Sequence, residues 1–87
     1  MPYVKQELRE AVARQTVALI GAIESQPIEV RAGLMNYVVT SMIHQLYKPS
    51  YANYNEAIGV LECIKLELYR RVVAKYEDSK IIENGDV

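Results

Sequence analysis

The chain has no Phe and no Trp, one Cys and one His, and each scarcity removes a class of site. The single thiol, Cys63, excludes an intrachain disulfide and a zinc site built from several cysteines. His44 has no second histidine with which to form a metal-binding pair at helical spacing. The glycines stand singly, at positions 21, 33, 59 and 85, so no glycine-rich loop can cradle a phosphate. We therefore expect no catalytic residue, no metal and no cofactor.

Strong charge and long apolar runs are also missing. Ten basic and eleven acidic residues give a formal net charge of -1, which offers no global attraction to duplex DNA or to an anionic membrane. Neither a secretory leader nor a membrane-spanning apolar run is visible. The sequence thus predicts a soluble, cytoplasmic protein with one helical domain, residues 1–87. A chain this short is near the lower limit for burying enough apolar surface alone, which favours self-association.

Tyrosine is the only aromatic residue type, and it occurs seven times. Its ring offers a flat stacking face and its hydroxyl needs a polar partner, whereas a core built only for burial has no reason to avoid Phe. One interpretation places half-buried tyrosines at a core rim or an oligomer interface; the other brings at least one of them against a ligand. The tyrosines are Tyr3, Tyr37, Tyr47, Tyr51, Tyr54, Tyr69 and Tyr76.

Hydrophobic periodicity predicts an all-α fold with three helices. The first covers about residues 5–24, and the second covers about residues 28–47. The start of the second helix is open, because it could begin at Pro27 or follow a short turn and begin after Gly33. The short connection around Pro49 indicates that the second and third helices are antiparallel neighbours.

The third helix is predicted over about residues 53–76. Asn53, followed three residues later by Glu56, fits a capping box that opens this helix. Residues 77–87 are rich in acidic side chains and contain an Asn-Gly turn signal, so we expect a short polar C-terminal tail.

An apolar stripe runs along the third helix, with a lysine at its centre. At about 100° per residue, six apolar side chains share one face, which we expect to be buried, and Lys65 projects from its middle. A buried, unpaired ammonium is costly, so Lys65 needs a partner or this face is not simply core. The apolar stripe consists of Ala57, Ile58, Leu61, Ile64, Leu68 and Val72.

The third helix is also apolar on its second side. A surface helix of a monomer does not need two apolar sides, so the pattern predicts a helix held between its own core and a second subunit. A small bundle completed by oligomerisation would result. Cys63 has no activating motif nearby, which predicts a packed, unreactive thiol. The candidate oligomer-interface residues are Val60, Cys63, Leu66 and Val73.

Cationic and aromatic side chains gather in the sequence of the third helix and form the candidate ligand site. Arginine side chains bind phosphate or carboxylate through paired N–H donors, and tyrosine rings stack on bases. The set could therefore bind an anionic, nucleotide-like ligand at a subunit interface, with Lys65, Arg70 and Arg71 on phosphate and Tyr54 or Tyr69 stacking. Ordinary ion pairing is the alternative: Glu67 precedes Arg70 and Arg71 by three and four residues, and Glu62 precedes Lys65 by three. The candidate ligand-binding residues are Lys65, Tyr69, Arg70, Arg71, Tyr54 and Asn55.

Three segments resemble a family of small uncharacterised proteins found in tailed phages, prophages and some bacteria and archaea. They are residues 1–4, residues 33–40, and residues 54–78 followed by the closing Glu-Asn-Gly-Asp-Val. The family usually has proline after Ala74, where this chain has Lys75, so the third helix should end less sharply here. The first helix resembles nothing specific. The resemblance implies a phage or mobile-element context but brings no established activity.

We expect a non-enzymatic, phage-associated helical binding protein that acts as a homo-oligomer in the host cytoplasm. Sequestration of a nucleotide-like host immune signal is one role known for small oligomeric helical proteins, and the link to this chain is by analogy. A protein-protein adaptor or inhibitor of a host enzyme is the alternative. A nucleic-acid-binding regulator is disfavoured by the near-zero net charge.

Overall fold

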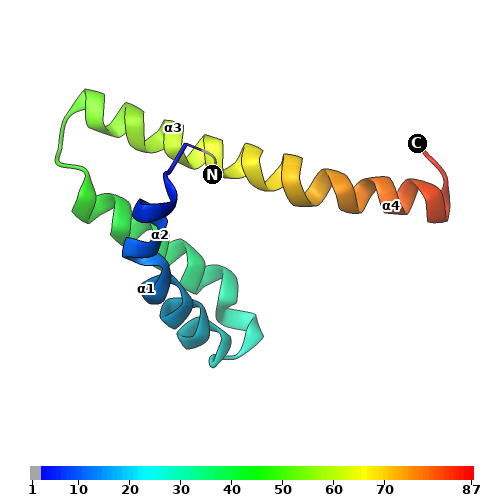
Figure 1. Ribbon diagram of the computed structural model, residues 1–87, viewed down its shortest axis with the longest axis horizontal. Helices are drawn as coiled ribbons and strands as arrows, with labels where there is room; N and C mark the ends of the chain where they lie inside the picture. The colour runs from blue at the N-terminus through cyan, green and yellow to red at the C-terminus, as the bar shows by residue number, and fades with distance from the viewer. Residues whose placement is uncertain (1–2) are drawn as a thin grey trace. The chain divides into compact units, whose positions relative to one another are not determined.

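The computed structural model describes residues 3–87, which form helices joined by short turns, without a strand among them (Figure 1). Met1 and Pro2, which open the first segment of the family resemblance, lie outside the described residues. The prediction of an all-α fold with three helices is confirmed. By its contacts the chain divides into two compact units, Met1–Leu46 and Tyr47–Val87. A single domain over residues 1–87 stays a prediction.

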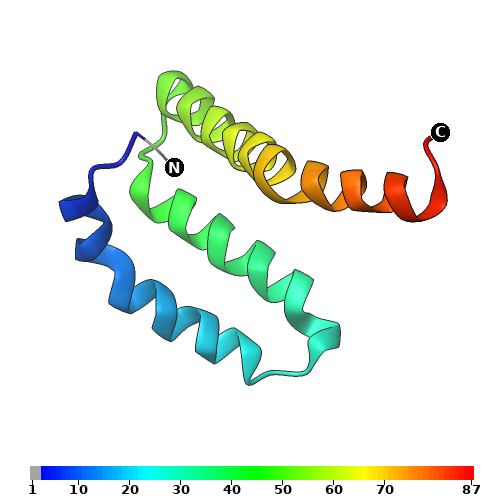
Figure 2. The same cartoon turned by 45° about the vertical axis from the view of Figure 1, so that its right-hand side comes forward.

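The first unit is a helical hairpin. Helix α1 spans Gln6–Glu24, a short 3-10 helix η1 spans Ile28–Val30, and helix α2 spans Arg31–Leu46. Helices α1 and α2 contact each other and lie side by side (Figure 2). Pro27 is the last residue of the connection between α1 and η1. Proline cannot continue a helix, because it lacks the backbone N–H, but it is tolerated at the start of one. The least exposed apolar side chains of this unit are Ile23, Leu34, Val38, Val39 and Ile43.

The second unit is essentially one long helix, residues 51–84 (Figure 1). It consists of α3 (Tyr51–Leu68), a π-helical turn η2 (Tyr69–Val73) and α4 (Ala74–Asn84). In the π-turn the Ala74 N–H donates to the Tyr69 carbonyl, five residues back instead of four. Gly85 ends the long helix with φ of 87°, a conformation that glycine adopts without a steric penalty.

The long helix begins at Tyr51, so the predicted start at 53 and its capping box are wrong. Ser50 is the N-cap, and its Oγ accepts a hydrogen bond from the Asn53 N–H at 3.0 Å. The Asn53 side chain instead donates to the Lys48 carbonyl at 3.0 Å. Ser50, three residues before Asn53, accepts a hydrogen bond from a backbone N–H of the first turn that would otherwise have no partner. The helix therefore starts after Ser50, and Asn53 lies inside it.

Ser50→Ala is expected to lower the free energy of unfolding by about 1 kcal/mol, because the first turn loses its side-chain acceptor. Denaturant unfolding followed by circular dichroism measures this change. Ser79→Ala is the matched control: Ser79 Oγ donates to the Tyr76 carbonyl within α4 and caps nothing, so its loss should change stability far less. Equal effects of the two substitutions would contradict the assigned cap.

The predicted polar tail is also wrong over residues 77–84, which continue the helix. The physical reason is that residues 75–84 contain neither Pro nor Gly, so nothing interrupts the hydrogen-bond ladder before Gly85. Lys80 pairs with Glu83 at 3.1 Å within the same turn and supports it. Residues 85–87 alone follow the helix without helical structure.

Burial of the apolar stripe is the third expectation that the structure corrects. Ala57 is 3% exposed, and among residues 3–87 it is the one side chain classed as buried. The five larger members of the apolar stripe are exposed, with Ile58 at 66% and Leu68 at 56%. The physical reason is simple: the second unit contains one long helix, and a single helix has no element of its own unit to cover an apolar face.

Candidate functional site

The six candidate ligand residues all lie on the long helix, but the structure separates them into two groups. Tyr54 and Asn55 lie in the first turns of α3, whereas the other four lie at or beyond Lys65. At 1.5 Å per residue, Tyr54 and Arg70 are about 24 Å apart along the axis. Within one chain the two groups are therefore separate, and the binding of a ligand by these six residues stays a prediction. Lys65, Tyr69, Arg70 and Arg71 remain as neighbours on successive turns.

Lys65 has its carboxylate partner within its own helix. Its Nζ lies 3.1 Å from Glu62 Oε1, one turn earlier, and its side chain is 70% exposed. The ammonium is therefore hydrated and paired, and the desolvation cost that a buried lysine would face does not arise. The ion pair that the spacing predicts is therefore present, and a role of Lys65 in binding a ligand stays a prediction.

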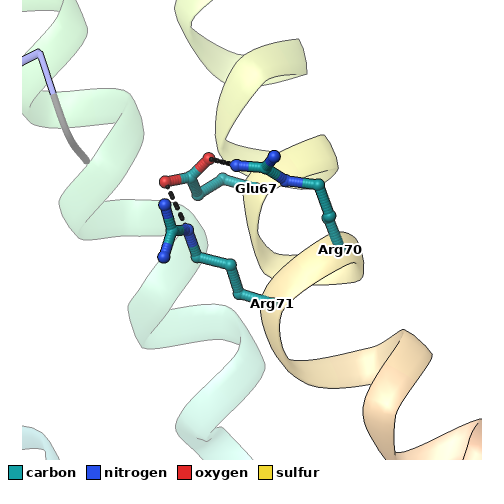
Figure 3. Close-up of polar contacts among 3 residues, drawn as sticks. All are labelled: Glu67, Arg70 and Arg71. Atoms are coloured by element: carbon teal, nitrogen blue, oxygen red, sulfur yellow. Dashed lines mark hydrogen bonds and ion pairs between the residues drawn. The ribbon is translucent and has the colours of Figure 1, made fainter.

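Arg70 and Arg71 share a single carboxylate (Figure 3). Arg71 Nε donates to Glu67 Oε1 at 2.9 Å, and Arg70 Nη2 lies 3.5 Å from Glu67 Oε2. The Glu67 side chain is 28% exposed, while those of Arg70 and Arg71 are 70% and 52% exposed. Two guanidiniums thus flank one less exposed carboxylate. The three side chains together carry one net positive charge.

The electrostatics of Glu67 follow from this arrangement. Partial desolvation raises the pKa of its carboxyl, but the charge and hydrogen bond of Arg71 lower it, and the net pKa is below its ordinary value. Glu67 therefore stays ionised at neutral pH. Its stabilising pairing is present above the pKa of the unfolded chain and is lost as the pH falls through the lowered value.

Tyr69 reaches across the π-turn. Its hydroxyl donates to the Glu77 carboxylate, eight residues later. In an uninterrupted α-helix, residues eight apart are offset by about 80° around the axis; one extra residue in the turn brings the offset to about 20°. The π-turn thus places the side chains of Tyr69 and Glu77 on the same side of the helix. The hydrogen bond and the charge of Glu77, with partial desolvation, raise the pKa of Tyr69.

Glu77→Gln is expected to bring the pKa of Tyr69 down toward its ordinary value of 10.0, because the acceptor charge is removed. A raised pKa means that folding favours the protonated phenol, so this contribution to stability is present below about pH 10 and is lost as the pH rises further. An NMR titration of the Tyr69 ring carbon that bears the hydroxyl measures it. Glu83→Gln, which alters the partner of Lys80 instead, is the control. Equal shifts in both variants would exclude the assigned contact.

Tyr47 has a similar carboxylate partner. Desolvation, followed by the hydrogen bond and charge of Glu56, raises the pKa of its hydroxyl. Two of the tyrosine hydroxyls therefore find carboxylates within the second unit, which gives a reason for Tyr over Phe at these positions. Both contacts escape inspection of the sequence, because spacings of eight and nine residues fall outside the usual three or four.

The candidate oligomer-interface residues lie open on the long helix. Val60, Cys63 and Leu66 are exposed, and Val73 is half-buried. The prediction of a packed Cys63 thiol is wrong for the chain alone, since no element of the second unit lies over the helix to cover it. The role of these residues in an interface stays a prediction.

The comparison with protein families covers the whole chain. A family described as a domain of unknown function (DUF6899) matches residues 1–87. The chain belongs to the DUF6899 family. The predicted resemblance to uncharacterised proteins is confirmed in this form, and the family also includes the first helix, for which the sequence indicated nothing specific. No curated protein and no solved structure matches the chain.

Elsewhere in this DUF6899 chain, the first unit has a shallow apolar groove where α1 and α2 approach their connection. None of the candidate residues lines it; its lining residues are Ile20, Ile23, Glu24, Arg31 and Met35.

Within residues 3–87, no three His, Cys, Asp or Glu side chains gather to form a metal site. No helix in the described part of the chain has the length and apolarity needed to cross a membrane.

Proposed function

We propose that this chain is a non-enzymatic binding protein whose binding surface is the apolar stripe of the long helix. The observation that carries the proposal is the exposure of the stripe: Ile58, Leu68 and their apolar neighbours face solvent on a helix that has no second element in its unit. Helices in proteins gain most of their stability from packing an amphipathic face against another element. A partner that covers the apolar stripe supplies the packing surface that this unit lacks.

The energetics favour a partner over a solvated helix. Full burial of a Leu or Ile side chain contributes about 1.5–3 kcal/mol, and five large stripe residues remain substantially exposed. Contiguous exposed apolar surface of this kind marks interaction sites in proteins. The stripe therefore supports binding to a protein or to another copy of the chain.

The test is the native mass of the protein purified gently from the cell that makes it. We expect the 9.9 kDa chain to be recovered in complex, with further copies or with a second protein. Recovery of only the bare 9.9 kDa monomer at micromolar concentration would overturn the proposal, because the stripe would then stay solvated without a partner.

A second candidate function is capture of an anionic, nucleotide-like ligand, and the pair Arg70 and Arg71 favours it. Each guanidinium offers five N–H donors, and the contacts with Glu67 engage only a few of them. Forked donors on neighbouring residues suit phosphate oxygens. The π-turn that carries both arginines is of a kind often found at functional sites.

A thermal-shift panel of cyclic and linear nucleotides tests this second candidate. Stabilisation by a nucleotide should be lost in Arg70→Ala and in Lys65→Ala but retained in Arg14→Ala, which alters an exposed arginine of α1. If no nucleotide raises the thermal unfolding temperature of the wild type, this second candidate function is wrong.

The family resemblance supports a phage or prophage context, in which the chain would act in the host cytoplasm. A host enzyme bound and inhibited through the long helix is the alternative partner there. Capture of one dominant host protein by the wild type, lost on deletion of residues 77–87, would favour this alternative. Such a deletion removes most of α4 as well as the Tyr69 partner Glu77.

A further inference from the structure

An exposed Asn-Gly pair closes the long helix. Asn84 is the last residue of α4, and Gly85 follows it with φ of 87°. Both residues are exposed, and open space surrounds Gly85. Glycine has no Cβ, so its backbone nitrogen is the least hindered that can follow an asparagine. The pair therefore places a side-chain amide carbon beside an accessible backbone nitrogen.

We propose that Asn84 is a site of spontaneous deamidation. The Gly85 nitrogen forms a bond to Cγ of Asn84, the bond from Cγ to Nδ2 breaks, and the Gly85 amide proton leaves on that nitrogen as ammonia. Water, the only co-reactant, then opens the resulting succinimide ring. Opening at Cγ leaves aspartate at position 84. Opening at the backbone carbonyl carbon leaves isoaspartate, in which the main chain runs through the former side chain.

The last turn of α4 controls this reaction. The Gly85 N–H donates to the Ile81 carbonyl at 2.8 Å, and the helical backbone of Asn84 differs from the conformation that ring closure needs. Ring closure therefore requires the last turn to open. Helix ends open readily, and within the second unit no other element packs on α4 to hold this turn. The rate of deamidation is thus the rate of the open turn multiplied by its population.

The other asparagines lack this combination of features. Asn36, Asn53 and Asn55 lie inside α2 and α3, and each is followed by a residue with a large side chain, Tyr or Glu. The side chains of Asn36 and Asn53 are also held by hydrogen bonds. Helix interiors open far less often than helix ends. Asn84 is therefore the asparagine that reacts first.

Deamidation changes the end of the long helix. Either product adds a negative charge at the negative end of the helix dipole, between Glu83 and Asp86. Isoaspartate also lengthens the main chain by a carbon atom, which interrupts the hydrogen-bond ladder. The modified chain therefore has a shorter α4 and a more negative net charge than the unmodified chain.

Timed incubation of the full chain at neutral pH, followed by peptide mapping with mass spectrometry, tests the proposal. We expect the mass increase that accompanies replacement of an amide nitrogen by oxygen to appear first in the peptide that contains Asn84. Isoaspartate should form part of the product.

Ile82→Gly and Ile82→Ala form a matched pair that tests control by the last turn. The Ile82 side chain is 88% exposed, and neither substitution alters the Asn-Gly pair. Glycine weakens the last turn relative to alanine, so the Gly variant should deamidate about fivefold faster than the Ala variant in the folded chain. In denaturant, where no turn is closed, the two variants should react at the same rate.

Deamidation of Asn84 in the denatured chain, with none in the folded chain over the same period, would overturn the proposal because the last turn would then stay closed. Equal rates in the two folded Ile82 variants would overturn control by the last turn. Asn84→Gln is the blank. A mass increase of the same size and rate in this variant would place the reaction at another residue and would also overturn the proposal.

Discussion

Leu68→Glu is expected to release the chain from its partner. Leu68 is 56% exposed in the chain alone, so in a monomer this substitution should change stability by no more than about 0.5 kcal/mol. Across an interface it removes about 1.5–3 kcal/mol of apolar burial and buries a charge without a partner. We expect the dissociation constant to rise at least about 100-fold, measured by sedimentation equilibrium over a range of concentrations.

Val17→Glu is the matched control for this substitution. Val17 is an exposed apolar residue of α1, 69% exposed, and lies outside the apolar stripe. The same change of side chain there should leave both mass and stability nearly unaltered. Equal effects at Leu68 and Val17, or no effect at either, would mean that the stripe has no partner.

Lys75→Pro is expected to break the long helix just after the π-turn. Lys75 is the second residue of α4, and a proline there removes a backbone donor and presses its ring against the carbonyl four residues back. The cost is about 3 kcal/mol or more in a helix interior. Loss of helical ellipticity, corresponding to part or all of the eleven residues of α4, should accompany a fall in unfolding free energy.

Lys75→Ala is the control for the proline substitution, since it removes the ammonium but keeps the backbone N–H and a good helix former. It should retain the wild-type helicity. The comparison also tests whether the helix tolerates the proline that the family resemblance implies at this position. Unchanged ellipticity and stability in the proline variant would contradict a continuous helix through residues 74–84.

The sequence predicts the helices well where the signal is local. Pro27 and the apolar periodicity place both ends of α1 and the end of α2 to within one residue. The start of α2 at Arg31 differs by three residues from the predicted 28, because residues 28–30 form the 3-10 helix η1. The start of the long helix is missed because Ser50 and Asn53 are both good caps, and their backbone geometry decides which one acts. Its end is missed because polar composition over residues 77–84 resembles a tail, although no residue there breaks a helix.

The candidate site is predictable only for contacts between residues three or four apart. The pairs of Glu62 with Lys65 and of Glu67 with the two arginines follow directly from the spacing. The contact of Tyr69 with Glu77 depends on the π-turn, and a carbonyl bonded five residues ahead leaves no recognisable pattern in a sequence.

The apolar stripe illustrates a different limit of sequence reasoning. Periodicity identifies the face that needs cover, but it does not specify which element or which chain covers it. The same pattern predicts burial in a core and burial against a second copy. Exposure of Ile58 and Leu68 excludes their burial in the core of this chain, and burial against a second copy stays a prediction.

Amide hydrogen exchange across residues 61–72 tests most directly whether a partner covers the long helix. If the stripe is covered by a second copy, these amides are protected in the wild type at high protein concentration, and protection falls on dilution below the dissociation constant. Rapid exchange at every concentration, or protection that is independent of concentration in a chain of monomeric mass, would contradict the account.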